Sequence, residues 1–121
     1  MQLIITHMSG PRDGEALLIE AAGLPPSVNF GRHSDCSVSL PDDPEISRRH
    51  ARLVWQDGSW WLEDLGSTNG TFVGEFARQQ KITATIGIET GLIIRVGLSR
   101  FSIDLAQALK DTRLMAATHG G

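Results

Sequence analysis

The sequence predicts an all-β protein, and three observations support this fold class. Hydrophobic and polar residues alternate along residues 51–56, which is the two-residue period of a half-buried strand. Asp57-Gly58 follows directly, and this dipeptide is a strong signal for a two-residue hairpin loop. Glycine and proline divide the rest of the chain into short segments, as in β-sandwiches. We therefore expect short strands packed as an antiparallel sandwich.

Length and composition limit the class of protein. The chain has 121 residues, 40% of them hydrophobic and 21% charged, which fits a single globular domain. Its net charge of −3 provides no general basic field, so we expect no nucleic-acid partner. Residues 3–6 lack the charged flank of a signal peptide, and no apolar run is long enough to span a membrane. We expect a cytoplasmic protein without membrane contact.

The N-terminal half supplies three candidate strands. Residues 15–22 are good helix formers, but their short span between two glycines favours a strand. Residues 27–30 are strand-like and lead into the polar residues 31–34. This polar stretch reaches the end of the sheet discussed below only if the next strand, within residues 38–40, is very short.

The hairpin at Asp57-Gly58 predicts a strand register. The first strand, residues 51–56, pairs with a return strand over residues 60–65. If the loop has two residues, the register sets Ser47 opposite Thr68 and His50 opposite Leu65. Two polar loops therefore leave this strand pair at the same end of the sheet.

The C-terminal half predicts a second hairpin. Apolar and polar residues alternate over residues 92–96 and again over 101–105, with a turn at residues 97–100 between them. Residues 106–121 have a helical composition and follow the last strand. We expect this tail to fray or to lead elsewhere.

The sequence offers little for a metal site. Cys36 is the only cysteine, so it cannot form an internal disulfide, and we interpret it as a small apolar side chain. With one thiol, His33 and Cys36 make a poor metal site. We expect no metal and no cofactor.

Three motifs stand in order at the edges of the predicted strands. They are Gly31-Arg32, Ser47-Arg48-Arg49-His50 and Ser67-Thr68-Asn69-Gly70-Thr71. In this order and spacing they resemble the signature of the forkhead-associated (FHA) domain, over about residues 1–105. The resemblance implies an antiparallel β-sandwich of about eleven strands that binds phosphothreonine peptides through loops at one apex. Residues 106–121 would then be a tail or linker stub.

The residues of these motifs fit the chemistry of a phosphate ligand. Phosphothreonine carries close to two negative charges and three acceptor oxygens, so its site needs a planar cation and short donors. The resemblance implies that Arg32 and Ser47 grip the phosphate, that Arg48 and Thr68 support it, and that Asn69 binds the peptide backbone. The partner would be a protein phosphorylated by a serine/threonine kinase.

Three further residues are expected to support the site. Gly31 lets the chain bend beside Arg32, and Asn69-Gly70 readily adopts the positive φ angles of a tight turn. The resemblance implies that His50 is buried and holds the loops. Two departures from the family pattern, Gly74-Glu75 and Gly91-Leu92, leave the turn geometry of residues 72–80 open.

Two alternative functions are compatible with parts of the sequence. Ser47, His50 and Asp64 could form a catalytic triad, but the chain has no nucleophile-elbow motif. Ser47 and His50 are also three apart on a segment expected to be extended, so they would point to opposite faces. We therefore expect no enzyme and no catalytic residue. A scaffold that binds partners without phosphate is the second alternative, and the intact Arg32 and Ser47 argue against it.

The tail carries one weaker hypothesis. Met115 follows Thr112 by three residues, and phosphorylated Thr112 could dock on a neighbouring copy of the chain. An ordinary surface threonine is the simpler interpretation. The sequence predicts no oligomeric state.

Overall fold

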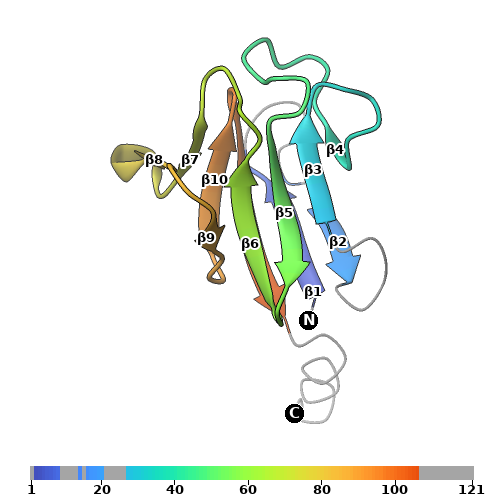
Figure 1. The fold of residues 1–121 in the computed structure, drawn as a ribbon, viewed down its shortest axis with the longest axis vertical. Coiled ribbons are helices and arrows are strands. Elements are labelled where there is room, and N and C mark those ends of the chain that lie inside the picture. Colours follow the sequence, from blue (N-terminus) through green and yellow to red (C-terminus); the bar gives the residue numbers. More distant parts are fainter. Residues whose placement is uncertain (1, 9–13, 15, 21–26, 107–121) are drawn as a thin grey trace.

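The computed structural model describes residues 2–8, 14, 16–20 and 27–106, and their strands form two packed sheets (Figure 1). One short 3₁₀ helix, η1 (Phe76–Arg78), interrupts the strands. In chain order the strands are β1 (Gln2–His7), β2 (Ala16–Glu20), β3 (Ser27–Gly31), β4 (Val38–Ser39), β5 (Ala51–Gln56), β6 (Ser59–Asp64), β7 (Thr71–Val73), β8 (Gln80–Lys81), β9 (Ile86–Gly87), β10 (Leu92–Val96) and β11 (Ser99–Ala106).

The predicted all-β sandwich is confirmed. The six-stranded sheet has the order β2-β1-β11-β10-β7-β8, and the five-stranded sheet has the order β4-β3-β5-β6-β9. The pairing departs from the prediction at β3 and β4, which run parallel. They do so because the chain folds back through residues 32–37 before it enters β4, which is only two residues long. The very short strand expected within residues 38–40 is therefore present.

The core fills the space between the two sheets. Phe101 of the six-stranded sheet meets Phe30 of the five-stranded sheet edge to face, with ring centroids 5.2 Å apart. Both rings are fully buried. Trp60 is 2% exposed and packs edge to face against Trp55. Apolar side chains at every second strand position thus face inward, as the alternation predicted.

The hairpin between β5 and β6 has the predicted register. Gln56 pairs with Ser59, and Asp57 and Gly58 have φ angles of 55° and 77°. Two positive φ angles are typical of a type I′ turn, whose twist matches that of the flanking strands. The register continues beyond the strands, since the Leu65 amide donates to the His50 carbonyl at 2.9 Å.

Three boundaries differ from the predicted ones. Strand β6 covers Ser59–Asp64 rather than residues 60–65. The turn between β10 and β11 is shorter than residues 97–100, because Ser99 already pairs with Val96. Strand β11 extends to Ala106, where it pairs with Gln2, one residue into the predicted tail. Residues 107–121, and with them the hypothesis on Thr112 and Met115, lie outside the described residues.

Residues 15–22, which are helical by composition, contribute strand β2, so the strand interpretation is confirmed for Ala16–Glu20. These residues form a strand despite their helical composition because they pair with β1, as the edge strand of the six-stranded sheet. Among the described residues, no helix has the length and apolar character needed to cross a membrane.

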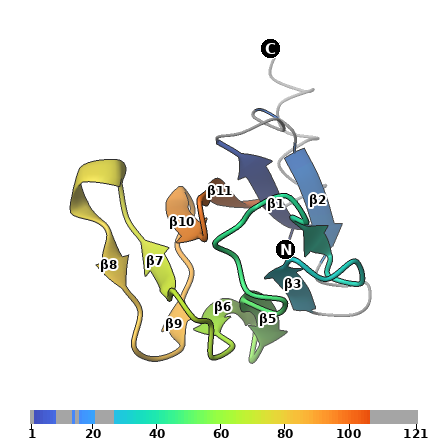
Figure 2. The same ribbon diagram turned by 90° about the horizontal axis from the view of Figure 1, so that it is seen from above.

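The topology gathers several loops at one end of the sandwich, here called the apex. Strands β3, β6 and β10 all point toward this end (Figure 1), and Figure 2 views the molecule from above it. The apex therefore contains residues 32–37, 40–50, 65–70 and 97–98. The polar clusters predicted to converge do so here.

Candidate functional site

Ser47 joins two apex loops. Its Oγ accepts a hydrogen bond from the Thr68 amide at 3.0 Å, across 21 residues of sequence. The position of Ser47 opposite Thr68, predicted from the hairpin register, is thus confirmed. The Ser47 side chain is half-buried and Thr68 is exposed, so both hydroxyl groups lie at the rim of the apex.

His50 lies beneath Ser47 and is fully buried. Its Nδ1 accepts a hydrogen bond from the Ser47 amide at 3.0 Å, and its Nε2 lies 2.7 Å from the Gly70 carbonyl oxygen. An amide can only donate, so Nδ1 must be the acceptor and Nε2 carries the proton donated to Gly70. One neutral imidazole therefore connects the Ser47 loop to the 67–70 loop.

Arg32 begins the third apex loop and is tied to the segment that carries Ser47. Its amide donates to the Ser47 carbonyl at 3.0 Å, and its Nη1 donates to the Ile46 carbonyl at 3.2 Å. The side chain remains exposed, and a guanidinium has five N–H donors in all. Arg32 is therefore oriented by the backbone and still presents donors to a ligand.

Gly31 is required for close packing beside the bend that the chain makes at residues 32–33. A Cβ at this position would lie 2.1 Å from the Arg48 carbonyl oxygen and 2.9 Å from Cys36 Sγ. Its φ is not in the left-handed region, unlike that of Gly70, whose φ is 89°. The two glycines thus serve the apex for different reasons, steric at Gly31 and conformational at Gly70.

Asn69 is exposed and held from one side only. Its Nδ2 donates to the Glu45 carbonyl at 2.9 Å, which leaves Oδ1 and a second N–H available for a ligand. The next amide, that of Gly70, donates to Ser67 Oγ at 2.9 Å. These bonds fix the 67–70 loop while its exposed side chains stay accessible.

Asp64 organises this loop, a role that the sequence did not suggest. Its carboxylate accepts hydrogen bonds from the amides of Gly66 and Ser67 and from the hydroxyls of Ser67 and Thr71. Burial alone would raise the pKa of Asp64, but these hydrogen bonds outweigh burial and lower it. Its position at the end of β6, two residues before the glycine of a turn, is the one available sequence signal.

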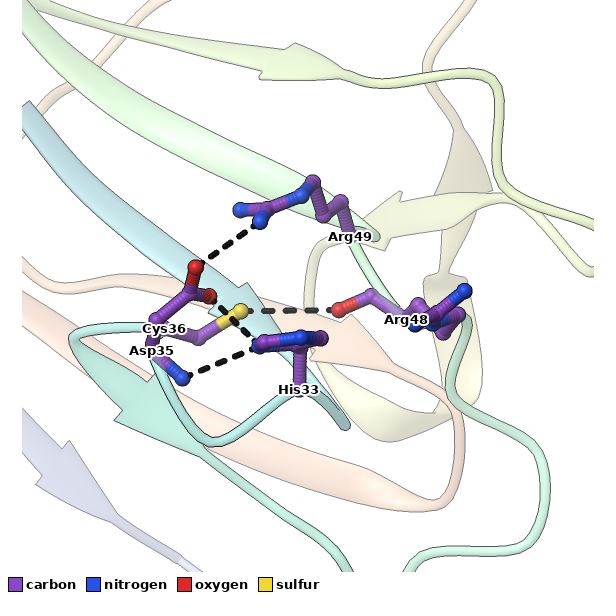
Figure 3. Close-up of polar contacts among 5 residues, drawn as sticks. All are labelled: His33, Asp35, Cys36, Arg48 and Arg49. Carbon is purple, nitrogen blue, oxygen red and sulfur yellow. Dashed lines mark hydrogen bonds and ion pairs between the residues drawn. The ribbon is translucent and has the colours of Figure 1, made fainter.

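Arg48 and Arg49 of the central motif differ in their side-chain partners (Figure 3). Arg49 donates to Asp35 Oδ2 at 2.9 Å, and Asp35 Oδ1 lies 2.8 Å from His33 Nδ1. The hydrogen bond from Arg49 lowers the pKa of Asp35. Arg48 is exposed, and no side-chain partner holds its guanidinium among the described residues. Arg48 is thus the cation of this pair that is free to meet a ligand.

Cys36 packs against the backbone of the segment that carries Arg48 and Arg49. It is 6% exposed, and its thiol lies 3.4 Å from the Arg48 carbonyl oxygen (Figure 3). Burial and the Asp35 carboxylate raise the pKa of this thiol, so it remains protonated. Within the described part of the chain, no cluster of three or more histidine, cysteine, aspartate or glutamate residues could hold a metal ion.

The imagined catalytic triad is not assembled. Ser47 and His50 do come together, contrary to the extended geometry expected, because the chain bends at residues 48–49. The contact, however, joins the Ser47 amide to the ring, while Ser47 Oγ accepts from Thr68. Both ring nitrogens of His50 face backbone atoms and Asp64 bonds to its own loop, so Asp64 does not orient His50.

The apex can therefore bind an anion. Arg32 and Arg48 supply two exposed cations, and the hydroxyls of Ser47 and Thr68 lie on the loops beside them. Charged donors and short hydroxyls on a fixed backbone are the groups that recognise phosphate.

Comparisons with known proteins agree on one family. Residues 28–97 match the FHA domain. FHA domain-containing protein FhaB of Mycobacterium tuberculosis strain H37Rv is 40% identical over 70 residues, which are 58% of this chain and 42% of that protein. An oxoglutarate dehydrogenase inhibitor of Corynebacterium diphtheriae is 37% identical over 76 residues, 63% of this chain and 50% of that protein. The chain thus spans half or less of these relatives.

Solved structures show the same fold. An FHA domain studied for phosphothreonine-dependent interactions superposes with a TM-score of 0.70 at 26% identity, covering 88% of this chain and 98% of that one. The FHA domain of an Arabidopsis thaliana protein gives a TM-score of 0.74 at 24% identity, covering 88% and 87% of the two chains. The second likeness concerns the fold alone.

Proposed function

Because this chain belongs to the FHA domain family, we propose that it binds a phosphothreonine-containing segment of a partner protein through the loops at its apex. The observation that carries this proposal is the junction at Ser47, where Arg32 and Thr68 each bond to the same serine. The junction brings all three family motifs together.

Each apex residue has a chemical role in this proposal. Arg32 and Ser47 grip the phosphate, the first as a planar charged donor and the second as a hydroxyl donor. Arg48 and Thr68 add charge and a further donor. Asn69 binds the backbone of the peptide through its amide, which both donates and accepts. Gly31, His50 and Gly70 hold the loops in place.

The proposed activity is recognition, without bond making or breaking. The partner is a protein that a serine/threonine kinase has phosphorylated, and the expected setting is the cytoplasm. A relative of known structure was studied for phosphothreonine-dependent interactions, and other relatives are named as an inhibitor or a regulator. A binding module that acts through a partner fits these names better than an enzyme does.

An oriented peptide library with a central phosphothreonine tests the proposal, with the same library carrying unmodified threonine as control. We expect the phosphorylated library alone to bind. Equal binding of both libraries would favour the phosphate-independent scaffold, and binding of neither would contradict recognition altogether.

A third library with phosphoserine measures the contribution of the threonine methyl group. Burying one methyl group contributes about 1 kcal/mol, which is a several-fold difference in affinity. We expect phosphothreonine to bind more tightly by this factor, and equal affinity would show that the apex does not bury the methyl group.

A further inference from the structure

Lys81 lies against the 67–70 loop. It belongs to β8, the edge strand of the six-stranded sheet. A Cβ added to Gly70 would lie 2.7 Å from Cε of Lys81 and 3.2 Å from its Cδ. The aliphatic part of the lysine therefore covers the Cα of Gly70. The carbonyl of the same glycine faces His50. Gly70 is thus held between the imidazole and the lysine.

Strand pairing places Lys81 at this position. Lys81 pairs with Phe72 across β7 and β8, and the next amide, that of Ile82, donates to the Thr71 carbonyl at 2.9 Å. Strand β7 leaves the apex and β8 returns to it, so Lys81 is at the apex end of this ribbon. Gly74, with a φ of 111°, and helix η1 form the turn at the far end.

The ammonium group of Lys81 is available to a ligand. Among the described residues, no hydrogen bond or ion pair engages its ammonium, and the side chain is exposed. Two other cations have internal partners: Arg49 pairs with Asp35, and Arg95 bonds to Gln79 and lies 4.2 Å from the centroid of the Phe72 ring. Lys81 thus has an unpaired ammonium on an aliphatic side chain that packs against Gly70. Because this packing already restrains the side chain, less conformational entropy is lost when a ligand binds.

We propose that Lys81 is a specificity-determining residue that selects an acidic side chain flanking the phosphothreonine. This inference rests on the proposed function, in which Asn69 holds the peptide backbone. Asn69 directly precedes Gly70, so a peptide held there passes close to the lysine. An ammonium is a compact charge with three donors, and a carboxylate on the peptide is its natural partner.

The test compares sub-libraries that keep the central phosphothreonine and fix glutamate or glutamine at one flanking position at a time. Glutamine matches glutamate in shape and lacks its charge. An exposed ion pair contributes about 0.2–1 kcal/mol, so we expect the wild-type protein to prefer glutamate by up to about fivefold at one or more positions.

Three variants assign that preference. Lys81→Met keeps the aliphatic cover on Gly70 and should reduce the ratio of the glutamate and glutamine affinities to about one. Lys81→Glu should reverse the ratio. Arg78→Ala removes an exposed cation at the far end of the same ribbon and should leave the ratio unchanged. Melting curves establish that each variant is folded.

Two results would overturn the inference while leaving the proposed function intact. One is that the wild-type protein shows no preference for glutamate. The other is a glutamate preference that persists in Lys81→Met; if this variant loses affinity equally for both sub-libraries, the lysine acts on the phosphate itself. If no phosphothreonine library binds the wild-type protein, the proposed function fails, and this inference fails with it.

Discussion

The amide of Thr68 donates a hydrogen bond to Ser47 Oγ at 3.0 Å, which joins two loops that are 21 residues apart in sequence. The hydroxyl hydrogen of Ser47 remains free, because an accepted bond uses only a lone pair. Ser47 can thus hold the Thr68 loop and donate to a phosphate oxygen at the same time.

Replacing Ser47 by alanine should therefore weaken binding more than folding. Losing a hydrogen bond to a charged oxygen costs about 1.5–3 kcal/mol, a loss of affinity of roughly tenfold to a hundredfold. Titration of a phosphothreonine peptide by fluorescence anisotropy measures the loss, with Ser37→Ala as a control on the neighbouring loop. An affinity within about twofold of the wild type would exclude Ser47 from the phosphate site.

Arg32 should show the difference between a charge and a planar fork. Arg32→Ala should abolish measurable binding, while Arg32→Lys should restore only part of it, because lysine keeps the charge and loses bidentate geometry. The same titration checks both, and Arg78→Ala should bind normally. Full rescue by lysine would mean that charge alone is recognised.

His50 should contribute mainly to folding. It is fully buried and bonds to backbone groups of two loops, so His50→Ala should lower the free energy of unfolding by about 2–4 kcal/mol. Urea unfolding measures this value. His33→Ala, at a more exposed histidine, should change it by less than about 0.5 kcal/mol. Similar losses in both variants would contradict the bridging role of His50.

Asp64 should make stability depend on pH. Its pKa is lowered in the folded protein, so its contribution is present above the unfolded value near 4 and is lost as pH falls through the folded pKa. Asp64→Asn should therefore lower the melting temperature at neutral pH, and the difference from the wild type should shrink in acid. A difference that stays constant down to about pH 2 would show that the carboxylate charge is unimportant.

The sequence predicted the parts of this site that depend on local rules. Asp57-Gly58 predicted the hairpin loop and the register of β5 and β6, and this register brings the loops that carry Ser47 and Thr68 to the same end of the sheet. Strand periodicity does not predict the contact of the Ser47 amide with His50, because the chain bends at residues 48–49 between them.

Other features depend on contacts between distant segments. Gly31 needs its missing side chain because Arg48 approaches it, and Lys81 covers Gly70 because β8 returns beside β7. Alternation within one strand carries no information on such approaches. The role of Asp64 also depends on how the loop after β6 coils around its carboxylate.

The location of the phosphate site is the central claim, and an NMR titration of the labelled protein with a phosphothreonine peptide tests it most directly. We predict that the largest shifts occur at the backbone amides of Arg32, Ser47, Thr68 and Asn69. The unphosphorylated peptide should leave these signals in place. Shifts confined to the outer face of β5 and β6, at Val54 and Trp61, with the apex amides unmoved, would contradict the account.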